Sequence, residues 1–538
     1  MYRSIFLKLF NRKFSKKEKV QKFGDLKNEV FLFSWISEYF QKAHRSDSSH
    51  VITDKVCNDL DFDELFMYLD RTKSKVGQQS LYSRLRLIDV VNQIDAEDEN
   101  LIKRISADEN LRASLEKQLS RLNSTEAFYI SKLFQDKIIK APSWYQFLPF
   151  LSIFSFLSII SLLFSNVMVY LIPILVIVNM GIHYRNKNNQ QHYISSLPEL
   201  LKLHSVVKNL HAADHTIFNE IEVEQSISTL GKLKKHFALF QMENKLQGDA
   251  SNLVWGSVEI IKILLLLEPI LFFRALKKID SNQDHIIHLF NALGRVDMLY
   301  SIASLRSGAD KFCIPNFTEA KTGLQATGIY HPLIENCVEN DIDTHGKSVL
   351  LTGSNMSGKT TFIRSIGINL ITSISLNTSF ASKFSLPKMR LSSAIRISDD
   401  LMNDKSYYFE EVSTIKEIIN CSERDNSYLF LLDEIFKGTN TIERISAGKA
   451  VLSYLARNNN VVFVSTHDIE LTDLLKDEYN LYHFSEVING DYVDFDYKLK
   501  SGKLKTRNAI RILEINQYPN PIIDEAKTTA IHLEMEQK

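Results

Sequence analysis

The pattern of hydrophobic and polar positions divides the chain into three kinds of sequence. Residues 51–140 and 185–310 carry many apolar side chains at helical spacing, which predicts packed helices. Residues 141–184 are apolar almost throughout. After about Gly328, short β-branched runs alternate with helical stretches, which is typical of an α/β domain with a mostly parallel sheet. The pattern therefore predicts an α+β protein of several domains, all-α first and α/β afterwards.

The apolar middle predicts a helical hairpin that spans a membrane. No Asp, Glu, Lys or Arg occurs in residues 141–184, and two apolar runs, Phe147–Phe164 and Val167–Ile182, lie within them. A spanning helix needs about 20 apolar residues, so each run alone is marginal. Residues suited to a membrane interface extend both runs: Trp144, Tyr145, His183 and Tyr184.

Positive charge brackets this stretch on both sides, at Lys137, Lys140, Arg185 and Lys187. Such flanks are expected of a hairpin at residues 147–182 with both ends in the cytoplasm. The alternative is a buried hairpin in a soluble helical domain. We disfavour it because soluble core helices normally keep a polar face, whereas this stretch offers little beyond Ser and Asn.

Two further segments are each consistent with more than one structure. Residues 1–24 hold many Lys and Arg against one acid, Glu18, so they are either a solvated tail or a segment that rests on anionic lipid. The apolar run Ile260–Phe273 contains Lys262, Glu268 and Pro269, which favours a packed core helix over a membrane span.

Amino-acid composition limits how the chain could contact nucleic acid and indicates the compartment and helix content to expect. Lys+Arg and Asp+Glu both number 64 among 538 residues, so any contact with nucleic acid must come from local patches. The four cysteines form no CxxC pair, which is typical of free thiols in a reducing compartment. With 10 Pro and 18 Gly, the chain is suited to long helices.

A phosphate-binding loop motif lies between an apolar run and a helical run. The apolar run ends at Leu351, and the match to G-x-x-x-x-G-K-[ST] begins at Gly353. Its glycines let backbone N–H groups surround phosphates at a helix N-terminus. Lys359 is expected to reach the β- and γ-phosphates of ATP, and the Thr360 hydroxyl to bind Mg²⁺. The predicted nucleotide-binding residues are Gly353, Ser354, Asn355, Met356, Ser357, Gly358, Lys359, Thr360 and Thr361.

Two further strands end in residues suited to ATP hydrolysis. Asp433 and Glu434 follow the apolar run 428–432, and His467 follows the run 461–464. Ligands of parallel sheets bind at the carboxyl edge of the strands. Asp433 is expected to hold Mg²⁺, Glu434 to polarise the attacking water, and His467 to hydrogen-bond the γ-phosphate.

Together these motifs resemble the MutS family of DNA mismatch repair ATPases. The matching segments are Gly353–Thr361, Asp433–Thr441 and Thr466–Leu471. The family also carries a Ser-x-Phe-x-x-Glu segment whose serine reaches the nucleotide of the partner subunit, and Ser406 and Glu410 are identified with it. Cys337 lies near the place where the family stacks an aromatic ring on adenine, so the resemblance makes Tyr497 a candidate replacement.

The resemblance has clear departures. The segment Leu69–Arg86 resembles the start of the family's lever domain. About 50 residues precede this lever region, without the Phe-x-Glu wedge that enters a mismatch. The DNA clamp is unidentifiable, and the apolar hairpin interrupts the lever region. Ser354 and Ser357 replace the usual Pro and Gly of the loop.

The resulting hypothesis is an all-α lever domain with an inserted transmembrane hairpin, followed by an α/β P-loop ATPase of the ABC type. The expected segments are a basic terminus (1–50), lever (51–140), hairpin (141–184), lever (185–310) and ATPase with a dimerising helical tail (311–538). The resemblance implies ATP, Mg²⁺, a homodimer with composite sites and DNA as partners. The hairpin implies a cytoplasmic-membrane location, with the other domains in the cytoplasm.

Two functions remain open at this point, a membrane-anchored MutS-like ATPase that acts on DNA and a membrane-bound mechanical dimer that has lost DNA binding. A transporter subunit is rejected, because no Leu-Ser-Gly-Gly-Gln segment precedes Asp433.

Overall fold

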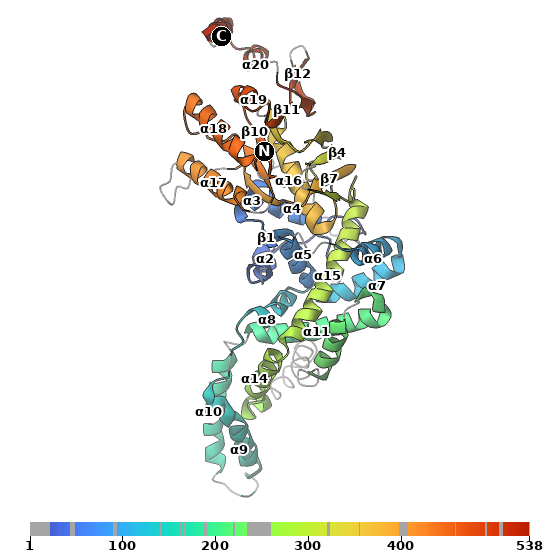
Figure 1. Ribbon diagram of the computed structural model, residues 1–538. Coiled ribbons are helices and arrows are strands. Elements are labelled where there is room, and N and C mark those ends of the chain that lie inside the picture. Colours follow the sequence, from blue (N-terminus) through green and yellow to red (C-terminus); the bar gives the residue numbers. More distant parts are fainter. Residues whose placement is uncertain are drawn as a thin grey trace.

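The protein is elongated, with a sheet-containing part at one end and the apolar hairpin at the other (Figure 1). The computed structural model describes residues 22–43, 49–89, 94–139, 141–161, 164, 168–187, 191–218, 221–233, 260–319, 323–354, 356–396, 407–424, 427–457, 459–489, 492–504 and 509–536. The mixed helical and sheet fold predicted from the sequence pattern is confirmed.

The helical part is organised around α15 (Gln283–Gly308), which runs from the hairpin region toward the sheet (Figure 1). The other helices of this part are α2 (Phe33–Gln41), α3 (Asp54–Asp59), α4 (Phe62–Leu69), α5 (Lys75–Arg86), α6 (Ala96–Ala107), α7 (Glu109–Leu119), α8 (Lys132–Gln135), α11 (Gln191–Ala213) and α14 (Leu267–Asp280). Side-chain caps set several starts, as at Ser74, which accepts from the N–H of Gly77, and Asp95, which accepts from that of Asp98.

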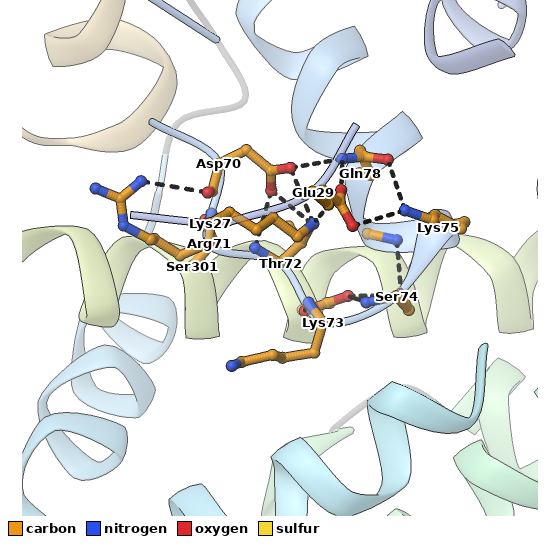
Figure 2. Close-up of polar contacts among 12 residues, drawn as sticks. Lys27, Glu29, Asp70, Arg71, Thr72, Lys73, Ser74, Lys75, Gln78 and Ser301 are labelled. Carbon is orange, nitrogen blue, oxygen red and sulfur yellow. Dashed lines mark hydrogen bonds and ion pairs between the residues drawn. The ribbon is translucent and has the colours of Figure 1, made fainter. Parts of the chain in front are cut away.

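A buried polar network fixes the N-terminal segment and α5 against α15 (Figure 2). The Asp70 carboxylate accepts hydrogen bonds from Lys27 (3.0 Å), Gln78 (2.7 Å) and Thr72. On α15, Asp297 accepts from the backbone N–H groups of residues 73 and 74. Burial acts to raise the pKa of Asp70, but Lys27 and these hydrogen bonds outweigh it and lower the pKa.

Replacing Lys27 with Met is expected to lower the free energy of unfolding of the helical part by about 3–5 kcal/mol, because it leaves the Asp70 charge buried and uncompensated. Urea unfolding followed by circular dichroism measures the change. Lys22→Met, at an exposed position of the same segment, is the matched control. Equal stability of the two variants would contradict this role for Lys27.

The sheet part contains a six-stranded sheet in the order β14-β11-β6-β10-β9-β8, in which the strands are parallel except for β14. A four-stranded sheet, β3-β7-β4-β5, lies beside it. The strands are β3 (Asn316–Thr318), β4 (Gln325–Ile329), β5 (Asn340–Asp343), β6 (Ser348–Thr352), β7 (Lys383–Pro387), β8 (Arg390–Ala394), β9 (Tyr428–Asp433), β10 (Val461–Ser465), β11 (Tyr479–His483) and β14 (Lys500–Ser501). Two short pairs, β1 (Ser49–Val51) with β2 (Leu87–Asp89) and β12 (Glu486–Asn489) with β13 (Tyr492–Phe495), stand apart from them.

Both faces of the six-stranded sheet are buried, which explains its continuous apolar strands. Leu429 and Leu431 face the core that includes α16 (Lys359–Leu376). Phe430 and Leu432 point the other way, toward α17 (Tyr407–Ser422), α18 (Thr441–Leu455) and α19 (Glu470–Leu474). The C-terminal helices are α20 (Ala509–Ile515) and α21 (Asn520–Glu536).

Two aspartates join the helical part to the sheet part near the start of α16. Asp59 is fully buried and accepts from the N–H groups of Ile395 and Arg396. Asp61 forms ion pairs with Arg364 on α16 (3.0 Å) and with Arg396 (2.6 Å). The helical part therefore contacts the helix that follows the phosphate-binding motif.

The apolar hairpin consists of a 3₁₀ turn, η3 (Ser143–Phe147), α9 (Leu148–Ser161) and α10 (Met168–Lys187). Among the described residues, one helix, Ser143–Ser161, is long and apolar enough to cross a membrane, and a shorter apolar helix covers Tyr170–His183. Many large apolar side chains are exposed here, among them Phe150 (71%), Phe154 (50%), Ile174 (60%) and Ile177 (71%). Ser165 and Asn166, which separate the predicted runs, lie outside the described residues.

The third apolar run differs from the single packed helix expected for Ile260–Phe273. Its second half packs as expected, with Phe272 and Phe273 buried in α14. However, a helical stretch ends at Leu264, and α14 begins only at Leu267, after Leu266 adopts a φ of 48°. Pro269 accounts for the break, because its ring clashes with the carbonyl four residues earlier and it has no N–H to donate.

Candidate ATP site at the sheet edge

The phosphate-binding motif forms the loop between β6 and α16. Gly353 (φ 142°) and Gly358 (φ 105°) adopt backbone conformations that side chains disfavour. A Cβ on Gly353 would lie 2.6 Å from the Phe484 carbonyl oxygen, so the loop has no room for one. Met356 is 73% exposed at the tip of the loop, and Asn355 lies outside the described residues.

Lys359 is buried beneath this loop. Its Nζ donates to the carbonyl oxygens of Gly353 (2.6 Å) and Ser354 (2.7 Å). Burial lowers the pKa of Lys359 to about 8, although the Glu434 and Asp433 carboxylates act to raise it. The ammonium group therefore lies inside the loop, where a phosphate group would be surrounded by backbone N–H donors.

Parallel register brings Asp433 to this loop. Asp433 ends β9 beside Ser465 of β10, whose hydroxyl donates to its carboxylate. The Thr360 Oγ1 donates to the other carboxylate oxygen of Asp433 at 2.8 Å. A hydroxyl and a carboxylate thus converge from α16 and β9. These oxygens fit Mg²⁺, which prefers hard oxygen ligands and keeps several waters.

Glu434 lies between a histidine and a lysine side chain. Its carboxylate contacts His467 Nε2 at 2.5 Å and Lys437 Nζ at 2.8 Å. Its backbone has a φ of 52°, and its N–H donates to the Ser465 carbonyl at 2.9 Å. Burial acts to raise the pKa of Glu434, but the hydrogen bonds from His467 and Lys437 outweigh it and lower the pKa to about 2. Glu434 is therefore ionised at neutral pH, as a general base must be.

Tyr497 lies against the phosphate-binding loop although nearly 140 residues separate them in sequence. A Cβ on Gly358 would lie 3.3 Å from the ring atom Cδ1 of Tyr497. Asn340 Nδ2 donates to the Tyr497 carbonyl at 3.0 Å, and the tyrosine side chain is 44% exposed. The ring is therefore held beside the loop with one part open to solvent.

Glu411 is a buried carboxylate that the sequence analysis missed. It lies on α17, is fully buried, and accepts from the backbone N–H groups of Phe436 and of Lys437 (3.3 Å). Phe436 has a φ of 62°, so Glu411 stabilises a strained loop directly after Glu434. Burial raises the pKa of Glu411, while these backbone hydrogen bonds act to lower it.

Comparison with known proteins identifies the sheet part. Residues 349–534 match MutS domain V. These residues therefore form a MutS domain V. The chain is similar to the DNA mismatch repair protein MutS of Thermotoga petrophila, with 31% identity over 277 residues that cover 48% of this chain and 33% of the relative. The MutS protein of Listeria welshimeri is 28% identical over 284 residues, covering 51% and 33%.

The match with these MutS proteins is partial, since the chain spans about one third of the length of the curated relatives it matches. The match covers the MutS domain V region, which holds the loop, Asp433, Glu434 and His467.

The MutS segment Ser-x-Phe-x-x-Glu also explains why Glu411 was missed. Counting from Ser406, this spacing places the glutamate at residue 411, one position after Glu410, which the sequence analysis had chosen. Glu410 is half-buried, whereas Glu411 is fully buried and bound to the loop at residues 436–437. Correct counting within the motif would have found it. Ser406 lies outside the described residues.

Proposed function

We propose that this protein binds and hydrolyses ATP with Mg²⁺ at the edge of the six-stranded sheet. The observation that carries the proposal is the convergence of Lys359, the Thr360–Asp433 pair and the Glu434–His467 pair around one loop. Members of the MutS family are ATPases, which supports the same function.

The residues have distinct roles in this proposal. Lys359 and the loop N–H groups bind the β- and γ-phosphates. Thr360 and Asp433 hold Mg²⁺, which neutralises phosphate charge when bound. Glu434 orients the attacking water and accepts its proton. His467 keeps the Glu434 carboxylate in place and is expected to donate to the γ-phosphate. Tyr497 stacks on the adenine ring beside Gly358.

Phosphate release by the purified full chain tests this proposal. Turnover is expected to need both ATP and Mg²⁺ and to be lost in Lys359→Ala, because that change removes the charge that binds the phosphates. Lys449→Ala, at a partly exposed position of α18, is the control. Near-normal turnover by Lys359→Ala would overturn the assignment of the site.

We further propose that the protein acts as a homodimer on DNA, in a role related to mismatch repair. The support is its similarity to proteins named DNA mismatch repair protein MutS. Gel mobility of duplex, mismatched and branched DNA, with and without ATP, tests this role. Because formal net charge is zero, binding is expected to depend on local basic patches and to weaken steeply with salt.

A composite site can be tested by mixing two inactive variants. If Ser406 completes the partner's site, Ser406→Ala mixed with Lys359→Ala should regain about one quarter of the wild-type rate, since about half of the dimers are mixed and each has one intact site. The measurement is ATP turnover after subunit exchange. A mixture no more active than its components would indicate sites that do not share residues.

Glu411 is expected to act as a positioning residue. Glu411→Leu removes the acceptor for two N–H groups beside Glu434, so the turnover number should fall at least tenfold while the Michaelis constant for ATP changes little. Glu411→Gln keeps one carbonyl acceptor and should recover part of the rate. Equal losses in turnover and in ATP binding would point to general unfolding of the site instead.

We also propose that residues 147–182 anchor the protein in the cytoplasmic membrane, with the lever and ATPase domains in the cytoplasm. The exposed apolar side chains of α9 and α10 support this proposal. A second candidate function shares this anchor, a membrane-bound mechanical dimer that does not bind DNA. DNA mobility that is unchanged by the protein at low salt would favour that candidate.

A further inference from the structure

The helix break at Leu265–Leu266 leaves two backbone carbonyls without their usual partners in the helix. The donors would be the N–H groups four residues later, at positions 268 and 269. Pro269 has no N–H, and the chain turns away at Leu266 before Glu268 can donate. In an apolar environment, each unsatisfied carbonyl costs free energy comparable to a lost hydrogen bond.

Polar side chains of the hairpin satisfy both carbonyls. Asn179 Nδ2 donates to the Leu264 carbonyl at 2.8 Å and to Ser155 Oγ at 3.0 Å. Ser152 Oγ donates to the Leu265 carbonyl at 2.6 Å. Asn179 is fully buried and belongs to an uncharged stretch, so these bonds explain why it carries an amide at that position.

Further contacts extend this attachment toward the base of the hairpin. Tyr145 OH donates to the Ile270 carbonyl at 2.9 Å. Leu148, Leu266 and Ile270 form one small apolar core between the hairpin and α14. α9, α10 and α14 are therefore one packed unit, as they also appear at the lower end of the molecule (Figure 1).

The helical stretch at residues 260–264 adds exposed apolar side chains to those of the hairpin. Ile260 is 60% exposed and Ile261 is 52% exposed, next to a segment bound to α10. The charged residues nearby are turned inward. Lys262 and His183 each lie 3.7 Å from the Glu268 carboxylate, and all three side chains are buried. Residues 260–273 therefore present apolar side chains outward and enclose their two charged residues, Lys262 and Glu268.

We propose that residues 260–273 enter the bilayer with the hairpin, as a third and broken helix in its cytoplasmic half, with Ile260 and Ile261 against lipid acyl chains. This inference rests on the proposed membrane insertion of residues 147–182. Non-helical backbone is tolerated at membrane depth where protein side chains satisfy it, as Asn179 and Ser152 do here.

A continuous path of helices also connects the hairpin to the part of the protein that holds the proposed ATP site. α14 ends at Asp280, and after a short turn the chain continues as α15, which packs on α5 and reaches the sheet part (Figure 1). Because the hairpin holds the start of α14, packed helices and one short turn join α15 to the hairpin, with no long linker between them.

Fluorescence quenching in vesicles tests the inference. The full chain, with its four cysteines changed to Ala, carries one new cysteine at Phe154, Ile261 or Asp280, labelled with a polarity-sensitive dye. The vesicles contain phosphatidylcholine and phosphatidylglycerol, with a doxyl quencher placed high on the acyl chain. The labels at 154 and 261 are expected to show blue-shifted, quenched emission. The label at the exposed position 280, at the far end of α14, is expected to show neither.

The outcomes separate this inference from the anchor on which it rests. Quenching at 154 without quenching at 261 overturns the inference and leaves the anchor standing. Loss of quenching at both positions overturns the anchor itself.

A second variant tests the role of Asn179. Asn179→Leu removes the donor to the Leu264 carbonyl, so the label at 261 should lose its blue shift while the label at 154 keeps its own. Val178→Leu, an apolar change at a partly exposed neighbouring position, is the control and should leave both labels unchanged. Retained quenching at 261 in Asn179→Leu would show that the amide does not hold the segment in the bilayer.

Discussion

Replacing Glu434 with Gln is expected to slow ATP turnover by about 10²–10⁴-fold, the usual contribution of a positioned general base. Gln has nearly the same shape but cannot accept the proton of the attacking water. Lys359, Thr360 and Asp433 are untouched, so ATP should still bind. Single-turnover hydrolysis gives the chemical step, and a fluorescent ATP analogue gives the affinity.

The structure adds a second expectation for this variant. Glu434 pairs with His467 (2.5 Å) and Lys437 (2.8 Å), which together keep its pKa at about 2. The wild-type carboxylate therefore stays ionised from pH 5 upward, and the difference between wild type and variant should persist across that range. The ATP-bound variant should accumulate as a dimer, measured by light scattering. Glu417→Gln, exposed on α17, is the control, and a loss below tenfold in Glu434→Gln would remove Glu434 from the role.

Local sequence was sufficient to predict the strands that carry the site. The apolar runs before Gly353, Asp433 and His467 lie in β6, β9 and β10, because a strand buried on both faces needs continuous apolar residues. The parallel order of these strands then follows from alternation with helices. Thus the meeting of the three motifs at one sheet edge was predictable without any structure.

Contacts between distant segments were not predictable in this way. The position of Tyr497 beside Gly358 depends on how the chain returns after β12 and β13, which no local pattern encodes. The burial of Asp70 with Lys27 is equally long-range, since each residue looks like an ordinary surface charge in the sequence. Pro269 is a sequence signal for a helix break, but the sequence pattern was interpreted as one packed helix, and the new partners of the carbonyls at 264 and 265 required the structure.

Deleting residues 147–182 is expected to move the protein from the membrane fraction to the soluble fraction after a carbonate wash. The hairpin carries no charge, whereas a charged residue near the bilayer centre costs roughly 2.5–3.5 kcal/mol. Without the hairpin, residues 260–273 also lose the Asn179 and Ser152 donors that hold them, so they are not expected to anchor the chain alone. Fractionation of cells that express each form, followed by immunoblotting, makes the comparison.

The structure shows that deletion alone is an incomplete test, because it also uncovers Leu266 and Ile270, which pack against Leu148. The double variant Phe154→Arg/Ile177→Arg avoids this problem, since both side chains are at least half exposed on the hairpin surface. In water, two exposed arginines should leave the fold intact; in a bilayer, they should cost roughly 5–7 kcal/mol together. The double variant is therefore expected to wash off the membrane, whereas Ile221→Arg, equally exposed but outside the hairpin, should remain bound. A double variant that stays in the membrane fraction would mean that α9 and α10 face protein or water, not lipid.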